Sequence, residues 1–395
     1  HRTGWEIEKL RRKDEDDVAA KIAALEVRRA RIRTALDKVA GQKDAHASRL
    51  FWHTDLDAAK ADAAKRKLPI LSLRLLGNLD EDLSCANSRY FRTVLYADER
   101  VHHYLRQHYV LHWKSVRPVP VMTIEFGDGR TVCRTVTGNS AHYVLDAEGR
   151  PLDVIPGLYE AKAFRKHLET GHGLAKRLQG MTPADRALAL TVHHTAAGAR
   201  LDRAFHEDLE RIGDPRGRRL LAASEKHADA PSARRAAPVA VGKSAVETPA
   251  VRAIQPDVMD VLADTGRATW MRIADLPARR AELGKDSLRL MRAKAPTMSD
   301  EAFARMAQTF RRALAIDTVR NEYDLHRKLH AWFAGNEAGD DVELLNERVY
   351  AELFLTPSSD PWLGLVPEGA YSALDGGGIT SKAAAKPIAQ ASTSR

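Results

Sequence analysis

The sequence predicts a mixed α/β core with mostly helical segments on either side. The apolar run 68–76 is short and bounded by Pro and Gly, which is typical of a buried strand. Shortly after it, Cys85 precedes a segment in which Phe91, Val94 and Leu95 fall on one face of a helix. A strand is therefore followed by a cysteine at the start of a helix. Beyond residue 171, helical patterns dominate.

Cys85 is the residue on which the functional prediction depends. A helix N-terminus stabilises a thiolate more than a thiol, because free backbone N–H groups and the positive end of the helix dipole face the sulfur. The third residue after it is Ser88, which can cap the helix and hydrogen-bond the sulfur but cannot form a disulfide. We therefore expect Cys85 to be a nucleophile near neutral pH, with a partly buried structural cysteine as the alternative.

The order of elements between Trp52 and Leu168 resembles the thioredoxin-like superfamily. The matching elements are a helix at 55–65, the strand at Ile70, the cysteine-headed helix, strands at 109–113, 142–145 and 152–155, and a helix at 161–168. The resemblance implies an α/β thioredoxin-like fold in which Cys85 attacks and Ser88 stands in the place of the resolving cysteine. Gly138-Asn139-Ser140-Ala141 stands where the superfamily has its cis-proline loop, so the resemblance implies that Ser140 and Ala141 bind substrate.

A β-hairpin inserted into this region is expected at 121–136, because two alternating arms flank Gly127-Asp128-Gly129. In the second arm Cys133 alternates with Thr131 and Thr135, which puts it on the more polar face. Cys133 is the second candidate thiol. It could pair with Cys85 only if their Cα atoms lie within about 7 Å.

Composition changes divide the chain into six expected segments. They are a charged helical segment (1–48), the thioredoxin-like domain (49–172), a helical extension (173–221), a flexible linker (222–252), a helical C-terminal module (253–374) and a disordered tail (375–395). The linker is rich in Ala, Pro, Ser, Lys and Arg and lacks the residues that build a core. In the extension, Thr182-Pro183 predicts a helix start and Gly213 its end.

The charged segment 1–48 is predicted to form a long helix with a narrow apolar seam. The seam residues follow a 4-3 spacing: Val18, Ile22, Leu25, Ile32, Leu36 and Val39. Such a seam packs either on another helix of the same chain or in a coiled coil with a partner.

The C-terminal module predicts helices at 301–314, 318–333 and 341–354. The second carries Glu322, His326 and His330 at every fourth residue, a spacing that a metal could use. Its face is largely apolar and no further ligand can be assigned, so we expect histidines packed in a helical core and no metal. His193 and His194 are adjacent, so they point in different directions, and we expect them to be exposed or to cap a helix.

Residues 353–365 form a candidate docking element. Pro357 ends the preceding helix and Asp360-Pro361 favours a turn, which places Trp362, Leu363 and Leu365 on irregular backbone. These side chains either fold back onto their own helices or anchor a partner.

Composition excludes several classes of protein. No run approaches the ~20 apolar residues of a membrane span. The 62 basic and 53 acidic residues are interspersed and belong to no nucleic-acid-binding module, so no nucleic acid is expected despite the net charge of +9. Two cysteines cannot build a disulfide scaffold. The chain starts at His1, and a cleaved signal peptide would explain this, which favours the periplasm or cell envelope over the cytoplasm.

Together these observations predict a thioredoxin-like protein that acts on thiols or disulfides of partner proteins by a one-cysteine mechanism. Cys85 would attack, Ser88 and the helix N-terminus would stabilise the thiolate, and glutathione or another external thiol would resolve the mixed disulfide. No other cofactor is expected. The alternative is a non-enzymatic subunit that uses the same fold and its long helices to assemble with other proteins.

Overall fold

The centre of the computed structural model is a four-stranded mixed sheet; the structure describes residues 4–6, 16–213, 266–363 and 365. The strands lie in the order β2 (Val110–Arg117), β1 (Ile70–Leu76), β5 (Ser140–Leu145) and β6 (Pro151–Pro156). β1 and β2 are parallel, β5 is antiparallel to β1, and β6 is antiparallel to β5. Every residue of β1, β5 and β6 is buried, because helices cover the sheet.

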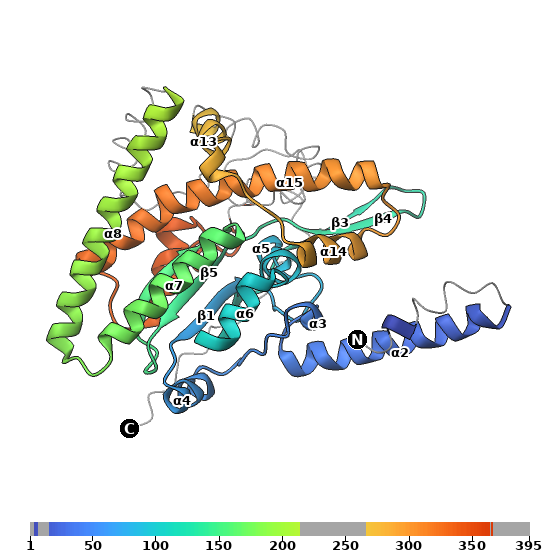
Figure 1. Cartoon of the computed structure of the whole chain (residues 1–395), viewed down its shortest axis with the longest axis horizontal. Coiled ribbons are helices and arrows are strands. Elements are labelled where there is room, and N and C mark those ends of the chain that lie inside the picture. The colour runs from blue at the N-terminus through green and yellow to red at the C-terminus, as the bar shows by residue number, and fades with distance from the viewer. Residues whose placement is uncertain (1–3, 7–15, 214–265, 364, 366–395) are drawn as a thin grey trace, which may run out of the picture.

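Helices from the N-terminal half pack on this sheet (Figure 1). α4 (Leu56–Arg66) contacts β1 and β2, α6 (Glu99–His108) contacts β2 and α7, and α7 (Ala161–Leu178) contacts β5 and β6. α5 (Ala86–Tyr90) begins directly after Cys85 and continues as the π-helical segment η1 (Phe91–Leu95). The strands and helices expected between residues 55 and 168 are therefore confirmed.

The C-terminal helices share one hydrophobic core with the sheet. α15 (Asp300–Arg320), the π-helical segment η3 (Asn321–His326) and α16 (Arg327–Ala334) follow one another without a break. The interruption expected between residues 314 and 318 is therefore wrong, and the reason is that the sequence there contains no Gly or Pro. α16 packs against β6 and along α8 (Pro183–Ile212).

The remaining described helices complete the C-terminal half. They are α13 (Gly266–Ala274), η2 (Pro277–Arg279), α14 (Lys285–Lys294), α17 (Val342–Arg348) and the π-helical segment η4 (Val349–Leu353). α13 packs on α15, and α14 packs on η1 beside α5. None of the described helices is long and apolar enough to cross a membrane.

The signals expected at the ends of α8 are confirmed. The Thr182 hydroxyl accepts a hydrogen bond from the Asp185 N–H at 3.2 Å, and Gly213 ends the helix with φ of 64°. The expected linker at 222–252 and the tail at 375–395 lie outside the described residues.

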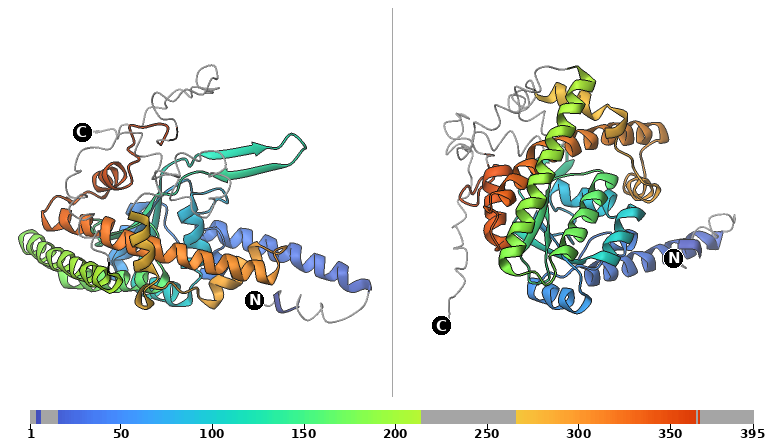
Figure 2. Two further views of the ribbon diagram at one scale, coloured as in Figure 1. Left: turned by 90° about the horizontal axis from the view of Figure 1, so that it is seen from above. Right: turned by 60° about the vertical axis from the view of Figure 1, so that its left-hand side comes forward.

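Two elements project from the body of the molecule (Figure 2). One is α2 (Asp16–Ala40), which leads into the short α3 (Ala45–Ser48). The other is the hairpin of β3 (Val121–Glu125) and β4 (Thr131–Thr135), which forms a separate two-stranded sheet and confirms the expected insertion. Several apolar side chains on these elements face solvent: Val27, Ile32, Val39, Val121 and Phe126.

Candidate functional site

Cys85 lies directly before helix α5, at the end of the loop that follows strand β1. Its N–H donates to the Leu76 carbonyl at 3.2 Å, which ties it to the end of the strand. It is also the N-cap of α5, and its Sγ accepts the backbone N–H of Ser88 at 3.4 Å. The sulfur therefore lies at the start of a helix, as the sequence predicts.

Ser140 completes the contacts of the thiol. As the first residue of β5 it pairs with Leu75 of β1, and its Oγ lies 3.3 Å from Cys85 Sγ. Ala141 is buried next to it and pairs with Arg74. Ser88 reaches the sulfur only through its backbone, because its hydroxyl donates to Ser84 Oγ at 2.6 Å and lies 2.9 Å from the Cys85 carbonyl.

C-terminal residues bind the residue that precedes Ser140. Asn139 precedes Ser140, and its carbonyl accepts the Tyr350 hydroxyl at 3.0 Å while its side-chain amide donates to Thr356 at 3.0 Å. Burial raises the pKa of Tyr350 well above its ordinary value, so this hydroxyl keeps its proton. Cys85 itself is 0% exposed.

Cys133 lies apart from this site. It sits opposite Thr123 on the projecting hairpin, and the Thr123 hydroxyl is 3.9 Å from its sulfur. Both cysteines are free; Cys133 is exposed and Cys85 is buried, so the structure holds no disulfide between them.

The segment around Trp362 packs at the end of β2. Arg117 donates to the carbonyls of Asp360 and Pro361 at 3.0 and 3.1 Å. Leu363 is 2% exposed and Leu365 is half-buried, whereas Trp362 is 41% exposed. The candidate docking residues thus divide between a buried leucine and a surface tryptophan.

A second cluster of chemically active side chains lies between β6, α8 and α16. Asp153 of β6, His194 of α8 and His330 of α16 bring one ligand atom each to within 4.8 Å of one another. His194 Nδ1 is 2.8 Å from His330 Nδ1, and His194 Nε2 donates to the Leu152 carbonyl at 2.9 Å. His326 Nε2 lies 3.0 Å from Asp153 Oδ1.

The expectation for His194 is wrong, because this side chain is fully buried rather than exposed or capping. Adjacent histidines do point in different directions, and for this reason His193 stays half-exposed while His194 faces the core. The sequence did contain one signal for the cluster. Asp153 stands between apolar neighbours in a predicted strand, and a carboxylate buried there needs a partner.

Burial governs the protonation of this cluster. It lowers the pKa of His194 to about 4 and that of the neighbouring His167 to about 3, and it lowers the pKa of His330 as well. Burial would raise the pKa of Asp153, but the charge of His326 and its hydrogen bond hold that pKa below its usual range. Three imidazoles therefore stay neutral around one carboxylate.

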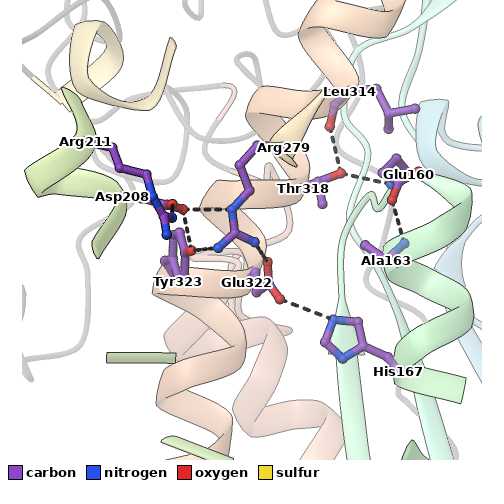
Figure 3. Close-up of polar contacts among 10 residues, drawn as sticks. All are labelled: Glu160, Ala163, His167, Asp208, Arg211, Arg279, Leu314, Thr318, Glu322 and Tyr323. Carbon is purple, nitrogen blue, oxygen red and sulfur yellow. Dashed lines mark hydrogen bonds and ion pairs between the residues drawn. The ribbon is translucent and has the colours of Figure 1, made fainter. Parts of the chain in front are cut away.

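Glu322 does not join His326 and His330, the histidines predicted to share its helix face; Figure 3 shows its contacts with Arg279 and His167. Its carboxylate pairs with Arg279 at 3.4 Å and lies 4.0 Å from His167. Arg279 also contacts the Tyr323 hydroxyl and pairs with the buried Asp208 of α8 at 2.7 Å. The i, i+4, i+8 stripe is divided because residues 321–326 form a π-helix, which changes the direction of successive side chains.

Comparisons with protein-family models, with curated proteins and with solved structures find no match for this chain.

Proposed function

We propose that this chain is a thioredoxin-like protein that works as a non-enzymatic interaction subunit of a larger assembly. The thioredoxin-like core is supported by the strand order β2-β1-β5-β6, with β1 and β2 parallel and the next two strands antiparallel. It is also supported by the cysteine at the N-terminus of the helix that follows β1.

The observation that carries the non-enzymatic part is the enclosure of Cys85. A nucleophilic thiol must reach the disulfide of a partner, and reactive cysteines are partly exposed whereas buried structural cysteines are inert. Cys85 has 0% exposure, and Asn139 beside it is bound by Tyr350 and Thr356. In this arrangement the sulfur packs as a small apolar group.

The projecting elements offer surfaces for a partner protein. An isolated two-stranded ribbon is marginally stable in water, so the hairpin gains from being covered. Val121 and Phe126 on it are 49% and 53% exposed. On α2, Ile32 and Val39 of the predicted seam are 51% and 75% exposed and could meet a helix partner, whereas Val18 is buried and Ile22, Leu25 and Leu36 are half-buried.

A one-cysteine thiol mechanism is the second candidate, and a specific contact set favours it. The Ser88 N–H and the Ser140 hydroxyl both lie at hydrogen-bond distance from Cys85 Sγ, and such donors stabilise a thiolate. For this mechanism the buried sulfur must first become accessible to the partner. An external thiol would then release the partner from its mixed disulfide with Cys85.

The alkylation rates of the two cysteines separate these functions. In native protein treated with iodoacetamide, we expect Cys133 to be modified quickly and Cys85 only when the protein unfolds, as measured by peptide mass spectrometry. A Cys133→Ser variant isolates the Cys85 signal. Modification of native Cys85 at a rate close to that of Cys133 would instead support the thiol mechanism.

The interaction function needs its own test. Full-length protein bearing Phe126→Asp is compared with wild type as bait in a pull-down from a lysate of the source cells. We expect the variant to lose specific partners while its melting temperature stays the same. Val192→Asp is the matched control, because Val192 is 60% exposed on α8, away from the hairpin. Equal loss with both variants would argue against the hairpin as the interface.

A further inference from the structure

The cluster around Asp153 has the donors that a transition metal requires. It offers two imidazoles and one carboxylate from three separate elements, and its ligand atoms lie within 4.8 Å of one another. Asp153 is 2% exposed, His194 0% and His330 5%. Histidine nitrogen and carboxylate oxygen are the ligands that zinc takes besides cysteine.

The hydrogen bonds of His194 orient it as a metal ligand. A carbonyl only accepts, so the 2.9 Å contact with Leu152 requires that His194 Nε2 carries the proton. The neutral ring therefore has its lone pair on Nδ1, which accepts a hydrogen bond from His330 Nδ1 at 2.8 Å, and a metal ion would take the place of that shared proton. Metal-bound histidines usually donate their other N–H to a carbonyl or carboxylate in this way.

We propose that Asp153, His194 and His330 form a binding site for a divalent transition metal ion, with zinc as the best match. Two ligand atoms on a tetrahedral zinc lie about 3.3 Å apart, given metal–ligand bonds near 2.0–2.1 Å. The largest separation in the cluster, 4.8 Å, must therefore shorten by about 1.5 Å when the metal binds. The 2.8 Å between the two imidazoles must open slightly.

His326 holds the carboxylate of this site in place, as groups beside metal ligands usually do. It is 0% exposed, its Nε2 contacts Asp153 Oδ1, and its Nδ1 has no hydrogen-bond partner in the described structure. With this ring beside the carboxylate, the site is closed to solvent. Non-haem iron enzymes with two histidines and one carboxylate keep open positions, so enclosure favours a closed zinc site.

Metal binding is predicted to stabilise the packing of the C-terminal helices on the sheet. The ligands come from β6, α8 and α16, so one ion would fix the C-terminal helices to the sheet. A ligand that binds only the folded state raises the apparent stability. Zinc should therefore raise the melting temperature of metal-free protein.

The test uses the full chain carrying a tag without histidines. After chelation and dialysis, the protein is titrated with Co²⁺ and Zn²⁺, and its metal content is measured by mass spectrometry. We expect one equivalent of metal, the intense visible absorption of four-coordinate cobalt, and a higher melting temperature with zinc. His194→Gln and His330→Gln should each weaken binding at least tenfold.

His103→Gln is the matched control, because His103 is an exposed histidine on α6. It should bind metal like wild type. Wild-type protein that takes up no metal, or that gives only the weak spectrum of six-coordinate cobalt, would overturn the proposal. Equal binding by wild type and both glutamine variants would also overturn it. The cobalt spectrum of wild type decides the matter even if a variant fails to fold.

Discussion

Acid should destabilise this protein through histidines that are buried in the neutral form, and His142 gives the clearest case. It lies in β5 between the rings of Phe91 and Phe164, with ring centroids 4.6 and 4.8 Å away. Its Nε2 is hydrogen-bonded to the Tyr96 hydroxyl at 2.6 Å. Burial alone lowers its pKa from 6.5 to about 3.

The sign and size of the effect follow from linkage. Because the folded pKa lies below the unfolded one, the unfolded state binds the proton more tightly, so stability is full above pH 6.5 and falls as the pH drops towards 3. At pH 5 the unfolded histidine is almost fully protonated and the folded one is not. The difference is about 1.5 pH units at 1.36 kcal/mol each, or about 2 kcal/mol.

The perturbation is the double variant Tyr96→Phe/His142→Phe, which replaces both partners of the hydrogen bond with apolar rings and leaves no orphaned group. Urea unfolding at pH 7 and pH 5 gives the loss of stability on acidification. We expect this loss to be about 2 kcal/mol smaller in the double variant than in wild type. Tyr96→Phe alone is the control and should keep the wild-type loss, because His142 still titrates. A double variant that loses as much stability as wild type would refute the reasoning.

Three further predictions concern stability. Leu363→Ala should lower the free energy of unfolding by about 2–5 kcal/mol, because Leu363 is 2% exposed, whereas Trp362→Ala should cost clearly less at 41% exposure; equal losses in chemical unfolding would contradict this. Arg279→Leu should cost about 1.5–3 kcal/mol, because the buried Asp208 loses its ion pair on η2 but keeps Arg211 and the Tyr323 hydroxyl, each at 2.7 Å; thermal unfolding with and without Asp208→Asn measures the coupling. Thr182→Ala should cost about 1 kcal/mol through the lost cap of α8, and an unchanged unfolding midpoint would show that the cap is not used.

The elements that the sequence predicts well have local causes. The hairpin follows from two alternating arms and a Gly-Asp-Gly turn, and the start of α8 follows from a capping threonine before a proline. The position of Cys85 at a helix start is equally local, because a strand, a loop and an apolar helix face follow one another along 68–95. In each case the residues that determine the structure lie within a few positions of one another.

Helices α6, α13 and α14 were not predicted, and the features of the two candidate sites that sequence reasoning missed depend on residues far apart in the chain. Beside the Cys85 site, Asn139 binds Tyr350 and Thr356, and no periodicity near Cys85 indicates these contacts. The burial of His194 depends on α16, whose Phe333 stacks on its ring with centroids 4.4 Å apart. Such pairings arise from how helices pack on the sheet, which a single sequence does not specify locally.

The Cys85 site and the histidine cluster are built on the same strands and on the same C-terminal stretch. Ser140 and Asp153 lie on the adjacent strands β5 and β6, where Asp153 pairs with Val144, about 13 Å along the strand from Ser140. The C-terminal stretch likewise provides His330 to one site and Tyr350 to the other. The packing of the C-terminal residues on the sheet therefore bears on both sites, directly on the histidine cluster and on Cys85 through Asn139, which precedes its contact Ser140.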